Sequence, residues 1–311
     1  MPVVDSAVVL RPEKGRWSGR WTPSRRRNLF GFLFVLPTVI FFALFNLYPM
    51  GKAFYISLYN YRPFFHPRFI GFDNYTYLWQ DDRFRTAMIN TFVFMIGTTA
   101  PLWILSLGVA LVMARDFRFK EVYRTLYFMP VIVSGVVVSV VWTLLYQENG
   151  PINTLISPVS SSPLYWLTSA SLAPWSIIIM AIWQSLGFYM VIFLAGLQNI
   201  PADLYAAASI DGAGGTAKFL YITLPLLRPT ALFVTVISLV NGFQTFTYQY
   251  VMTKGGPGDA TNVVALYIYS TAFSYQKIGL ASAMSLVMFV IIMLFTLVQF
   301  RVLRSENVSY V

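Results

Sequence analysis

The chain has 311 residues, of which 57% are hydrophobic and 11% charged, and its mean hydropathy is +0.63. Soluble domains carry about 25% charged residues, so this chain has too little polar surface to cover a water-soluble globule of its length. We therefore expect it to lie in a lipid bilayer. Cysteine is absent, which excludes disulfides and thiolate metal sites.

Six long segments carry no Asp, Glu, Lys or Arg. A helix needs about 20 apolar residues to cross the hydrocarbon core, and each segment reaches that length. The alternating strands of a membrane barrel do not occur. The sequence therefore predicts an all-α integral membrane protein with polar tails at 1–27 and 304–311 and a six-helix domain over 28–303. The predicted spans are 28–51, 86–114, 125–147, 175–197, 229–250 and 278–300, with a further element at 202–225.

The N-terminal tail and the Lys/Arg distribution predict the orientation. Arg25, Arg26 and Arg27 precede an apolar run that is too long for the 7–15-residue core of a signal peptide, so we expect an uncleaved first span. With the N-terminus inside, fifteen Lys and Arg lie on the inner face and seven on the outer face. The excess favours two cytoplasmic termini. It also explains the net charge of +10 without nucleic-acid binding.

Two segments on the outer face show no sign of a metal-binding or catalytic site. His66 is the only histidine, and one histidine without cysteine makes no usual transition-metal site. We interpret it as a surface residue. The stretch 149–174 is uncharged but rich in Pro, Ser and Asn, which indicates an external loop.

The predicted spans contain no acid, base or histidine. Carriers coupled to protons or ions usually keep such a group at depth. A sodium site built from carbonyls and hydroxyls stays possible, so a self-contained secondary carrier is disfavoured and not excluded. A membrane enzyme would need clustered histidines or acids at the bilayer edge. None is found, so we predict no catalytic residues and no enzyme activity in this chain.

Residues 203–225 interrupt the apolar pattern on the inner face. The spacing predicts a short helix over 203–211, ended by Gly212, and a second over 213–222 that Asp211 caps. Small side chains would let another protein approach closely; the alternative is an ordinary helical hairpin lying on the membrane. "GAGGTAKF" (212–219) lacks the Lys-Ser/Thr pair of a phosphate-binding loop, so we expect no ATP site.

"YAAASIDGAGGTAKFLYITLP" (205–225) resembles the EAA signature of ABC importer permeases. Ala206 stands where the signature has glutamate, which leaves open whether an ionic contact is made there. "FLFVLPTVIFFALFNLYPMGKAFYISLYNY" and "VMTKGGPGDAT" resemble the carbohydrate-uptake members, among them the maltose and glycerol-phosphate importer permeases. The positions that match the EAA signature are Ala207, Ala208, Asp211, Gly212, Ala213, Phe219, Ile222, Leu224 and Pro225.

The resemblance implies a type I ABC importer permease in the bacterial inner membrane. It implies a second homologous permease, two ATPase subunits that bind ATP and Mg²⁺, and an external solute-binding protein that delivers a sugar. This chain itself would hold no cofactor. Residues 202–225 would form the cytoplasmic coupling helix seated on an ATPase subunit. Residues 60–85 would contact the binding protein or lie at the lipid interface. The sugar stays open, as do a glycerol-phosphate or polyol substrate, the identity of the partner permease and whether the ATPase is shared.

Polar and aromatic side chains in the fourth and fifth spans are the candidates for a substrate pathway. Sugars bind to aromatic faces and to amide and hydroxyl groups, and in the maltose importer permease, which this chain resembles, spans near these positions line the sugar site. The alternative is that such groups join helices through hydrogen bonds. The candidates are Gln184, Phe188, Ser238, Asn241 and Thr245.

Overall fold

The computed structural model describes residues 23–158 and 162–303, which are almost entirely helical. The tails predicted at 1–27 and 304–311 therefore lie largely outside the described residues. The chain divides into one unit that ends at Lys52 and a second that begins at Ala53.

The first unit carries the first predicted span. Helix α1 (Pro23–Phe42) continues through a π-helical turn (Ala43–Leu47) into α2 (Tyr48–Ser57), which crosses the boundary between the units. The turn ends two residues before Pro49, whose ring would collide with the Phe45 carbonyl in a regular α-helix. The wider turn accommodates that proline, and the apolar stretch extends over Phe30–Ser57.

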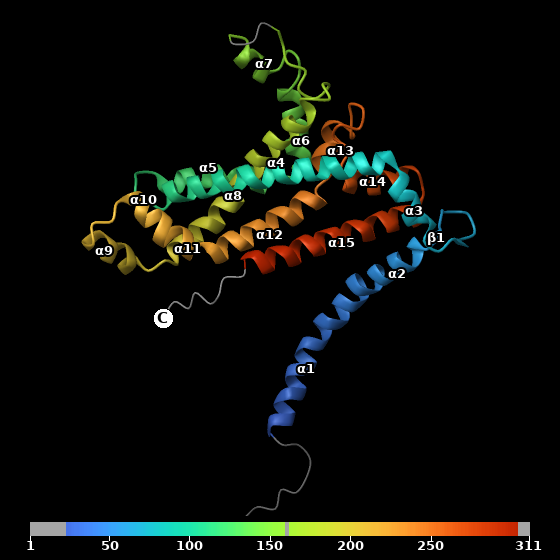
Figure 1. Cartoon of the computed structure of the whole chain (residues 1–311), viewed down its shortest axis with the longest axis horizontal. Helices are drawn as coiled ribbons and strands as arrows, with labels where there is room; N and C mark the ends of the chain where they lie inside the picture. The colour runs from blue at the N-terminus through green and yellow to red at the C-terminus, as the bar shows by residue number, and fades with distance from the viewer. Residues whose placement is uncertain (1–22, 159–161, 304–311) are drawn as a thin grey trace, which may run out of the picture. The chain divides into compact units, whose positions relative to one another are not determined.

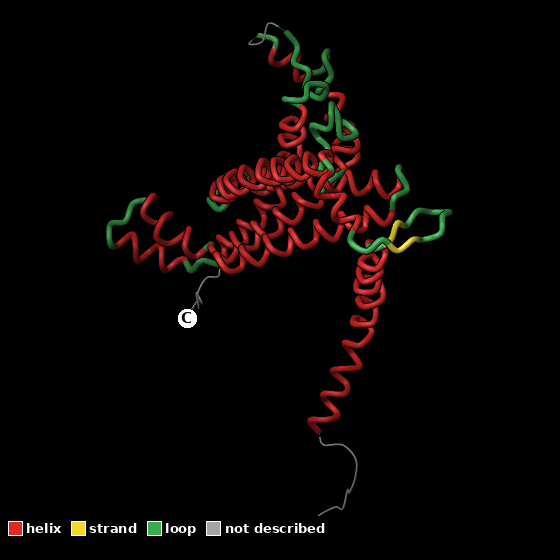
Figure 2. Tube along the Cα trace, turned by 45° about the vertical axis from the view of Figure 1, so that its right-hand side comes forward, coloured by secondary structure: helices red, strands yellow, loops and turns green. Residues whose placement is uncertain are grey.

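The second unit is a helical bundle with a small hairpin. Helices α4, α8, α12 and α15 lie side by side, with α5 packed along α8 (Figure 1). Strands β1 and β2 pair antiparallel with Tyr59 opposite Phe69 (Figure 2). The elements are β1 (Tyr59–Asn60), β2 (Arg68–Phe69), α3 (Asp73–Gln80), α4 (Asp82–Met113), α5 (Lys120–Ile132), α6 (Gly135–Leu145), α7 (Pro151–Ile156), α8 (Ala173–Gln198), α9 (Ala202–Ile210), α10 (Gly215–Lys218), α11 (Leu224–Leu226), α12 (Arg228–Gln244), α13 (Thr247–Met252), α14 (Val264–Tyr269) and α15 (Ile278–Leu303), with π-helical turns at Phe219–Thr223 and Ser270–Ser274.

Glycine sets the close packing of α5 on α8. A Cβ at Gly187 would collide with the Tyr127 carbonyl oxygen, so only glycine allows this approach. Large apolar side chains such as Met190 and Phe193 fill the core further along α8. Membrane helices pack in this way, because small residues let their backbones come near one another.

Two of the predicted spans are broken. The 125–147 span is α5 and α6, bent by 98° at a break between Ile132 and Gly135. The 229–250 span is α12 and α13, separated by an extended Thr245 and by Phe246. Prolines and glycines are tolerated in membrane helices where neighbouring groups satisfy the freed backbone, and here Gln184 of α8 donates to the Val133 carbonyl at the α5–α6 break.

The fold agrees with the predicted class. Within the described residues, five helices are long and apolar enough to cross a membrane, and there are six spans when the bent α5–α6 pair is counted as one. Helices α9 and α10 lie at one end of the second unit, and α3 with the β1–β2 hairpin lies at the opposite end (Figure 1). These are called the coupling end and the hairpin end below. The protein is an all-α, six-span membrane protein.

Candidate functional site

A cavity of about 200 Å³ opens between α4, α8 and α12. Among the described residues that line it, none is charged, and the polar groups are hydroxyls and one amide. Such a cavity offers hydrogen bonds to a neutral solute and no countercharge to an ion. Its lining residues are Phe94, Thr98, Leu102, Ala181, Ser185, Tyr189, Ser238, Asn241, Gly242, Thr245 and Tyr248.

A second cavity of about 450 Å³ adjoins the first at the two helix breaks. The two share Asn241, Thr245 and Tyr248, and the second adds Ser134 and Gly135 from the α5–α6 break. Breaks in membrane helices free backbone polar groups, which are tolerated where they line a cavity. We refer to the two together as the bundle cavity.

Three of the five predicted pathway residues line the bundle cavity, and they differ in what they offer. Asn241 donates through Nδ2 to the Tyr189 hydroxyl over 3.3 Å and is exposed on the isolated chain. Ser238 is buried, and its hydroxyl donates to the Thr235 carbonyl of its own helix over 3.1 Å. Thr245 marks the end of α12, where its N–H donates to the Asn241 carbonyl over 2.9 Å.

Gln184 and Phe188 are not among the lining residues. Gln184 is buried and donates through Nε2 to the Val133 carbonyl over 3.0 Å, which satisfies a backbone group freed at the α5–α6 break. Phe188 is 37% exposed and touches Tyr189 edge-on, with ring centroids 5.2 Å apart. Gln184 therefore supports the shape of the cavity, and Phe188 lies on an outer face of α8.

Sequence reasoning missed the other lining residues, and the polar ones among them in the first cavity are Thr98, Ser185, Tyr189 and Tyr248. Ser185 and Tyr189 lie four residues apart on α8, within the same stretch that supplied Gln184 and Phe188. Their shared helical face was a usable signal. Tyr248 follows the α12 break, and only the position of that break turns it toward the cavity.

The predicted coupling element has the expected two short helices. Gly212 has φ +77° and ends α9, with the Ala213 N–H bound to the Ala208 carbonyl at 2.8 Å and the Gly212 N–H to the Ser209 carbonyl at 3.2 Å. This pair of bonds is the Schellman termination that a left-handed glycine permits. The expectation that Asp211 caps the second helix is wrong, because α10 begins after Gly214 and no side chain caps it.

Hydrogen bonds join the two halves of this element. Lys218 donates through Nζ to the Ser209 hydroxyl over 2.7 Å, and the hydroxyls of Tyr205 and Thr223 are 2.9 Å apart. The partly buried side chain of Phe219 packs against the hydrophobic core of the bundle. The exposed surface of the element mixes apolar and acidic side chains: Ala206 and Ala207 are exposed, Ile210 is 88% exposed, and Asp203 and Asp211 are exposed as well.

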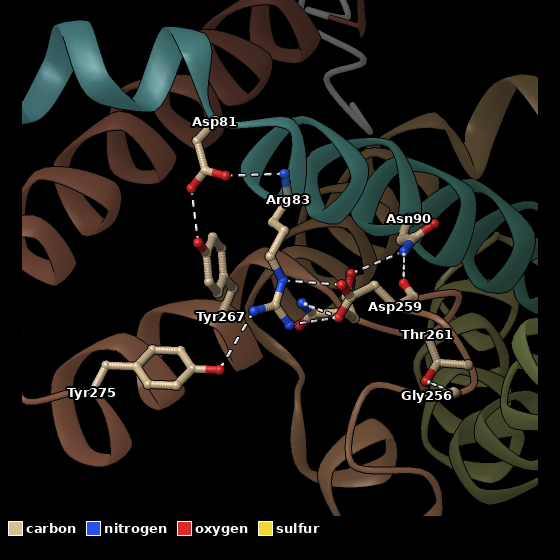
Figure 3. Close-up of polar contacts among 9 residues, drawn as sticks. Asp81, Arg83, Asn90, Gly256, Asp259, Thr261, Tyr267 and Tyr275 are labelled. Atoms are coloured by element: carbon tan, nitrogen blue, oxygen red, sulfur yellow. Dashed lines mark hydrogen bonds and ion pairs between the residues drawn. The ribbon is translucent and has the colours of Figure 1, made fainter.

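At the hairpin end, a polar network holds the loop 253–262 against the start of α4 (Figure 3). Arg83 donates through Nε and Nη2 to the two carboxylate oxygens of Asp259, at 3.0 and 2.9 Å. Asn90 donates through Nδ2 to the carbonyls of Asp259 and Asn262, at 2.7 and 3.0 Å. Bidentate pairs fix geometry as well as adding energy. The loop conformation is therefore set by α4.

A second part of the network caps α4 itself (Figure 3). The Asp81 carboxylate accepts from the Arg83 backbone N–H over 3.0 Å and from the Tyr267 hydroxyl over 2.8 Å. Burial raises the pKa of the Tyr267 phenol, and the hydrogen bond to Asp81 raises that pKa further, so Tyr267 stays a protonated donor. In the described residues, no group of histidine, cysteine and acidic side chains could hold a metal ion.

Comparison with known proteins places this geometry among transporters. The family described as "Binding-protein-dependent transport system inner membrane component" matches residues 104–305. The chain is 36% identical over 282 residues to "Probable ABC transporter permease protein YesP" of Bacillus subtilis (strain 168), covering 89% of this chain and 91% of the relative. It is 30% identical over 308 residues to "Arabinooligosaccharides transport system permease protein AraP" of the same organism, covering 98% of each.

A third relative and a solved structure extend the likeness. "Sulfoquinovosyl glycerol transport system permease protein SmoG" of Agrobacterium fabrum is 32% identical over 313 residues, covering 99% of this chain and all of the relative. The fold also matches a bacterial alginate ABC transporter solved in complex with an alginate pentasaccharide-bound periplasmic protein. The TM-score is 0.79, with 24% identity, over 91% of this chain and 98% of that chain.

Proposed function

Because the chain belongs to the binding-protein-dependent transport system inner membrane components, we propose that it is the permease subunit of an ATP-driven importer of a neutral sugar. The observation that carries the substrate class is the bundle cavity, whose described lining combines hydroxyls, two amides and two tyrosines without a charge. AraP, by its name, carries arabinooligosaccharides, which are neutral. Sugars of this kind are bound by aromatic faces and hydrogen-bonding groups.

The uncharged lining weighs against an anionic substrate. SmoG, by its name, carries a sulfoquinovosyl glycerol, and its sulfonate is anionic. A buried anion needs a cation or several hydrogen-bond donors around it. The described residues of the bundle cavity supply no cation. A glycerol-phosphate or other anionic solute is therefore the second candidate, and it would require the cation to come from a partner.

A second permease would complete the pathway. Asn241 lines the bundle cavity and is exposed on the isolated chain, so the cavity opens at the surface of this subunit. A polar opening on a membrane subunit is costly toward lipid, whereas a homologous partner could close it. The importer would also comprise two ATPase subunits and an external solute-binding protein.

The element over 202–225 supports docking to an ATPase subunit. Its exposed alanines allow close approach beside Ile210 and the acids Asp203 and Asp211, while Lys218, Tyr205 and Phe219 tie it to itself and to the bundle. A braced element can pass a rigid-body movement of the ATPase into α8 and α12. The coupling end and both termini would then face the bacterial cytoplasm.

The proposal is tested in proteoliposomes that contain the complete complex, with ATP inside and binding protein outside. We expect uptake of radiolabelled neutral oligosaccharides, arabinotriose and maltotriose among them, that requires both ATP and the binding protein. Uptake that follows an ion gradient without ATP would indicate a secondary carrier. Uptake of glycerol phosphate alone would favour the second candidate.

A further inference from the structure

A separate cavity of about 680 Å³ lies at the end of α6. Its volume falls within the range of about 300–1,000 Å³ that is usual for small-molecule sites. It is distinct from the bundle cavity, with which it shares no lining residue. We call it the outer cavity. Its lining residues are Thr143, Tyr146, Gln147, Glu148, Leu164, Tyr165, Trp166, Leu167, Thr168, Met252, Thr253, Gly256 and Pro257.

Two aromatic rings form a rigid wall of the outer cavity. Tyr146 and Trp166 have ring centroids 5.3 Å apart, at 31° to one another. The Tyr146 hydroxyl donates to the Ser176 carbonyl over 3.0 Å, and Trp166 Nε1 donates to Asn153 Oδ1 over 3.1 Å. The polar edges of both rings are thus bonded within the protein. Tyr146 is only 5% exposed and packs against both Trp142 and Trp166, so it holds the Trp166 ring in a fixed orientation. The partly exposed ring of Trp166 is the apolar surface that remains for a ligand.

The rim of the outer cavity is polar and has one sign of charge. Gln147, Glu148 and Thr168 are exposed there, and Tyr165 is 55% exposed. Among the described lining residues, Glu148 is the one that is charged. A carboxylate accepts hydrogen bonds from hydroxyl groups and repels anions. Aromatic faces beside such a rim suit a neutral sugar and disfavour an acidic one.

One pair of helices connects the outer cavity to the bundle cavity. At one end of this pair, Gly135 of α6 and Tyr248 of α13 line the bundle cavity. At the other end, Tyr146 follows α6 and Met252 ends α13, and both line the outer cavity. Helix α6 has eleven residues, so it is about 16 Å long. Along α13 the lining residues Tyr248 and Met252 are only one helical turn apart, so the two cavities are near neighbours along this pair of helices.

A further part of the lining of the outer cavity comes from the loop 253–262. Gly256 and Pro257 line the cavity, and the Thr261 hydroxyl donates to the Gly256 carbonyl over 2.8 Å. The same loop is held to α4 through Arg83 and Asn90. Both parts of the lining are thus pre-formed, and a pre-formed site loses less entropy when a ligand binds.

We propose that the outer cavity is an entry subsite that binds one ring of a neutral oligosaccharide before the sugar reaches the bundle cavity. This inference rests on the proposed function for the direction of movement. The binding step itself needs only the Tyr146–Trp166 wall, the Glu148 rim and the volume of the cavity.

Binding is tested by protection of a cysteine from alkylation, since the natural chain has none. Thr168→Cys places the thiol at the rim of the outer cavity, and Leu155→Cys places one on α7 at a residue that does not line it. The complete complex in nanodiscs is treated with an impermeant maleimide, with and without maltotriose. We expect maltotriose to slow alkylation of the Thr168→Cys variant several-fold and to leave the Leu155→Cys variant unchanged.

Two further arms separate sugar binding from other causes. Trigalacturonate, an acidic trisaccharide, should protect less than maltotriose, and Tyr165→Ala added to Thr168→Cys should weaken the protection. Equal alkylation with and without every neutral sugar tested would overturn the inference. Protection by the binding protein alone, with no effect of sugar, would also overturn it and assign the cavity to protein docking.

Transport distinguishes this inference from the proposed function. Glu148→Gln and Tyr165→Ala should lower uptake of maltotriose several-fold, while Leu155→Ala, at an exposed residue of α7 that does not line the outer cavity, should behave like the parent complex. If the parent imports maltotriose and both cavity variants match it, the entry subsite is wrong and the proposed function stands. If the parent imports no neutral sugar under ATP, the proposed function fails, whereas the alkylation result still decides whether the cavity binds one.

Discussion

Polar side chains at similar positions in the bundle differ in the hydrogen bonds that they leave for a substrate. Asn241 uses Nδ2 on Tyr189, so its carbonyl oxygen and the Tyr189 hydroxyl proton remain for a ligand. Ser238 donates its hydroxyl to its own helix, a common use of serine in helices. Among the predicted pathway residues that line the cavity, Asn241 therefore offers more to a sugar than Ser238 does.

This difference predicts the order of effects of substitutions in the bundle cavity. Losing one hydrogen bond to a neutral sugar costs about 0.5–1.5 kcal/mol. Asn241→Ala and Tyr189→Phe should each lower sugar uptake several-fold, and Ser238→Ala should lower it less. Uptake is measured in proteoliposomes and normalised to assembled complex, with basal ATPase activity as the control for assembly. If both the Asn241→Ala and the Tyr189→Phe variants take up sugar like the parent, the bundle cavity is not the substrate pathway, and the pathway must follow another face of the bundle.

The sequence allowed part of the bundle cavity to be predicted. Ser238, Asn241 and Thr245 recur every three to four residues, which places them on one side of a helix. The role of Gln184 could not be predicted in this way. It depends on the free carbonyl of Val133, and that carbonyl is free only because α5 ends there.

The sequence did not predict the two helix breaks, between α5 and α6 and between α12 and α13. A run such as 125–147 is uncharged and long enough for one span, and prolines like Pro130 are tolerated within membrane helices. Whether the helix continues depends on what satisfies the freed backbone groups. In this protein the amide of Gln184, 51 residues further along, does so at the break. The residues around the break therefore do not show that such a distant hydrogen-bond donor is present.

The coupling element was easier to predict because its signals are local. Glycine at position 212 matches the left-handed conformation that ends α9. The start of the second helix was misplaced because Ala213 and Gly214 stay outside α10. Asp211 is therefore separated from α10 by three residues and is too early in the chain to act as its N-cap.

A substitution at Gly212 tests whether the shape of this element matters for transport. A left-handed conformation costs an L-residue about 1–2 kcal/mol, and a β-branched residue is a stronger outlier there. Gly212→Val should abolish or strongly reduce sugar uptake and sugar-stimulated ATPase activity, while membrane insertion stays normal. Both activities are measured on purified complex.

Two matched variants make the Gly212 result specific. Gly212→Asn should retain most activity, because asparagine tolerates the left-handed region. Gly215→Ala should be neutral, because Gly215 is helical and a Cβ there meets no atom within 4 Å. Normal coupled transport by Gly212→Val would mean that the stretch is only a connection between α8 and α12.

At the scale of the whole molecule, the distribution of Lys and Arg agrees with the roles proposed for the two ends of the second unit. Hairpin and coupling elements lie at opposite ends of the second unit (Figure 1). The Lys and Arg count favours the cytoplasm for 198–228, which contains the coupling element. The outer cavity and the 253–262 loop adjoin the segments that the same count places outside. One orientation is therefore compatible with the charge rule and with the proposed ATPase docking and sugar entry.

This orientation predicts which engineered cysteines react from outside the cell. Thr216→Cys, exposed in α10, should be protected from a membrane-impermeant thiol reagent in intact cells, because it lies on the cytoplasmic side. Ser171→Cys, exposed in the segment before α8, should be labelled. After the cells are made permeable, both should react, which controls for accessibility in the folded protein. The reverse pattern in intact cells would place α9 and α10 outside, where no ATPase subunit could reach them, and the proposed importer would then be wrong.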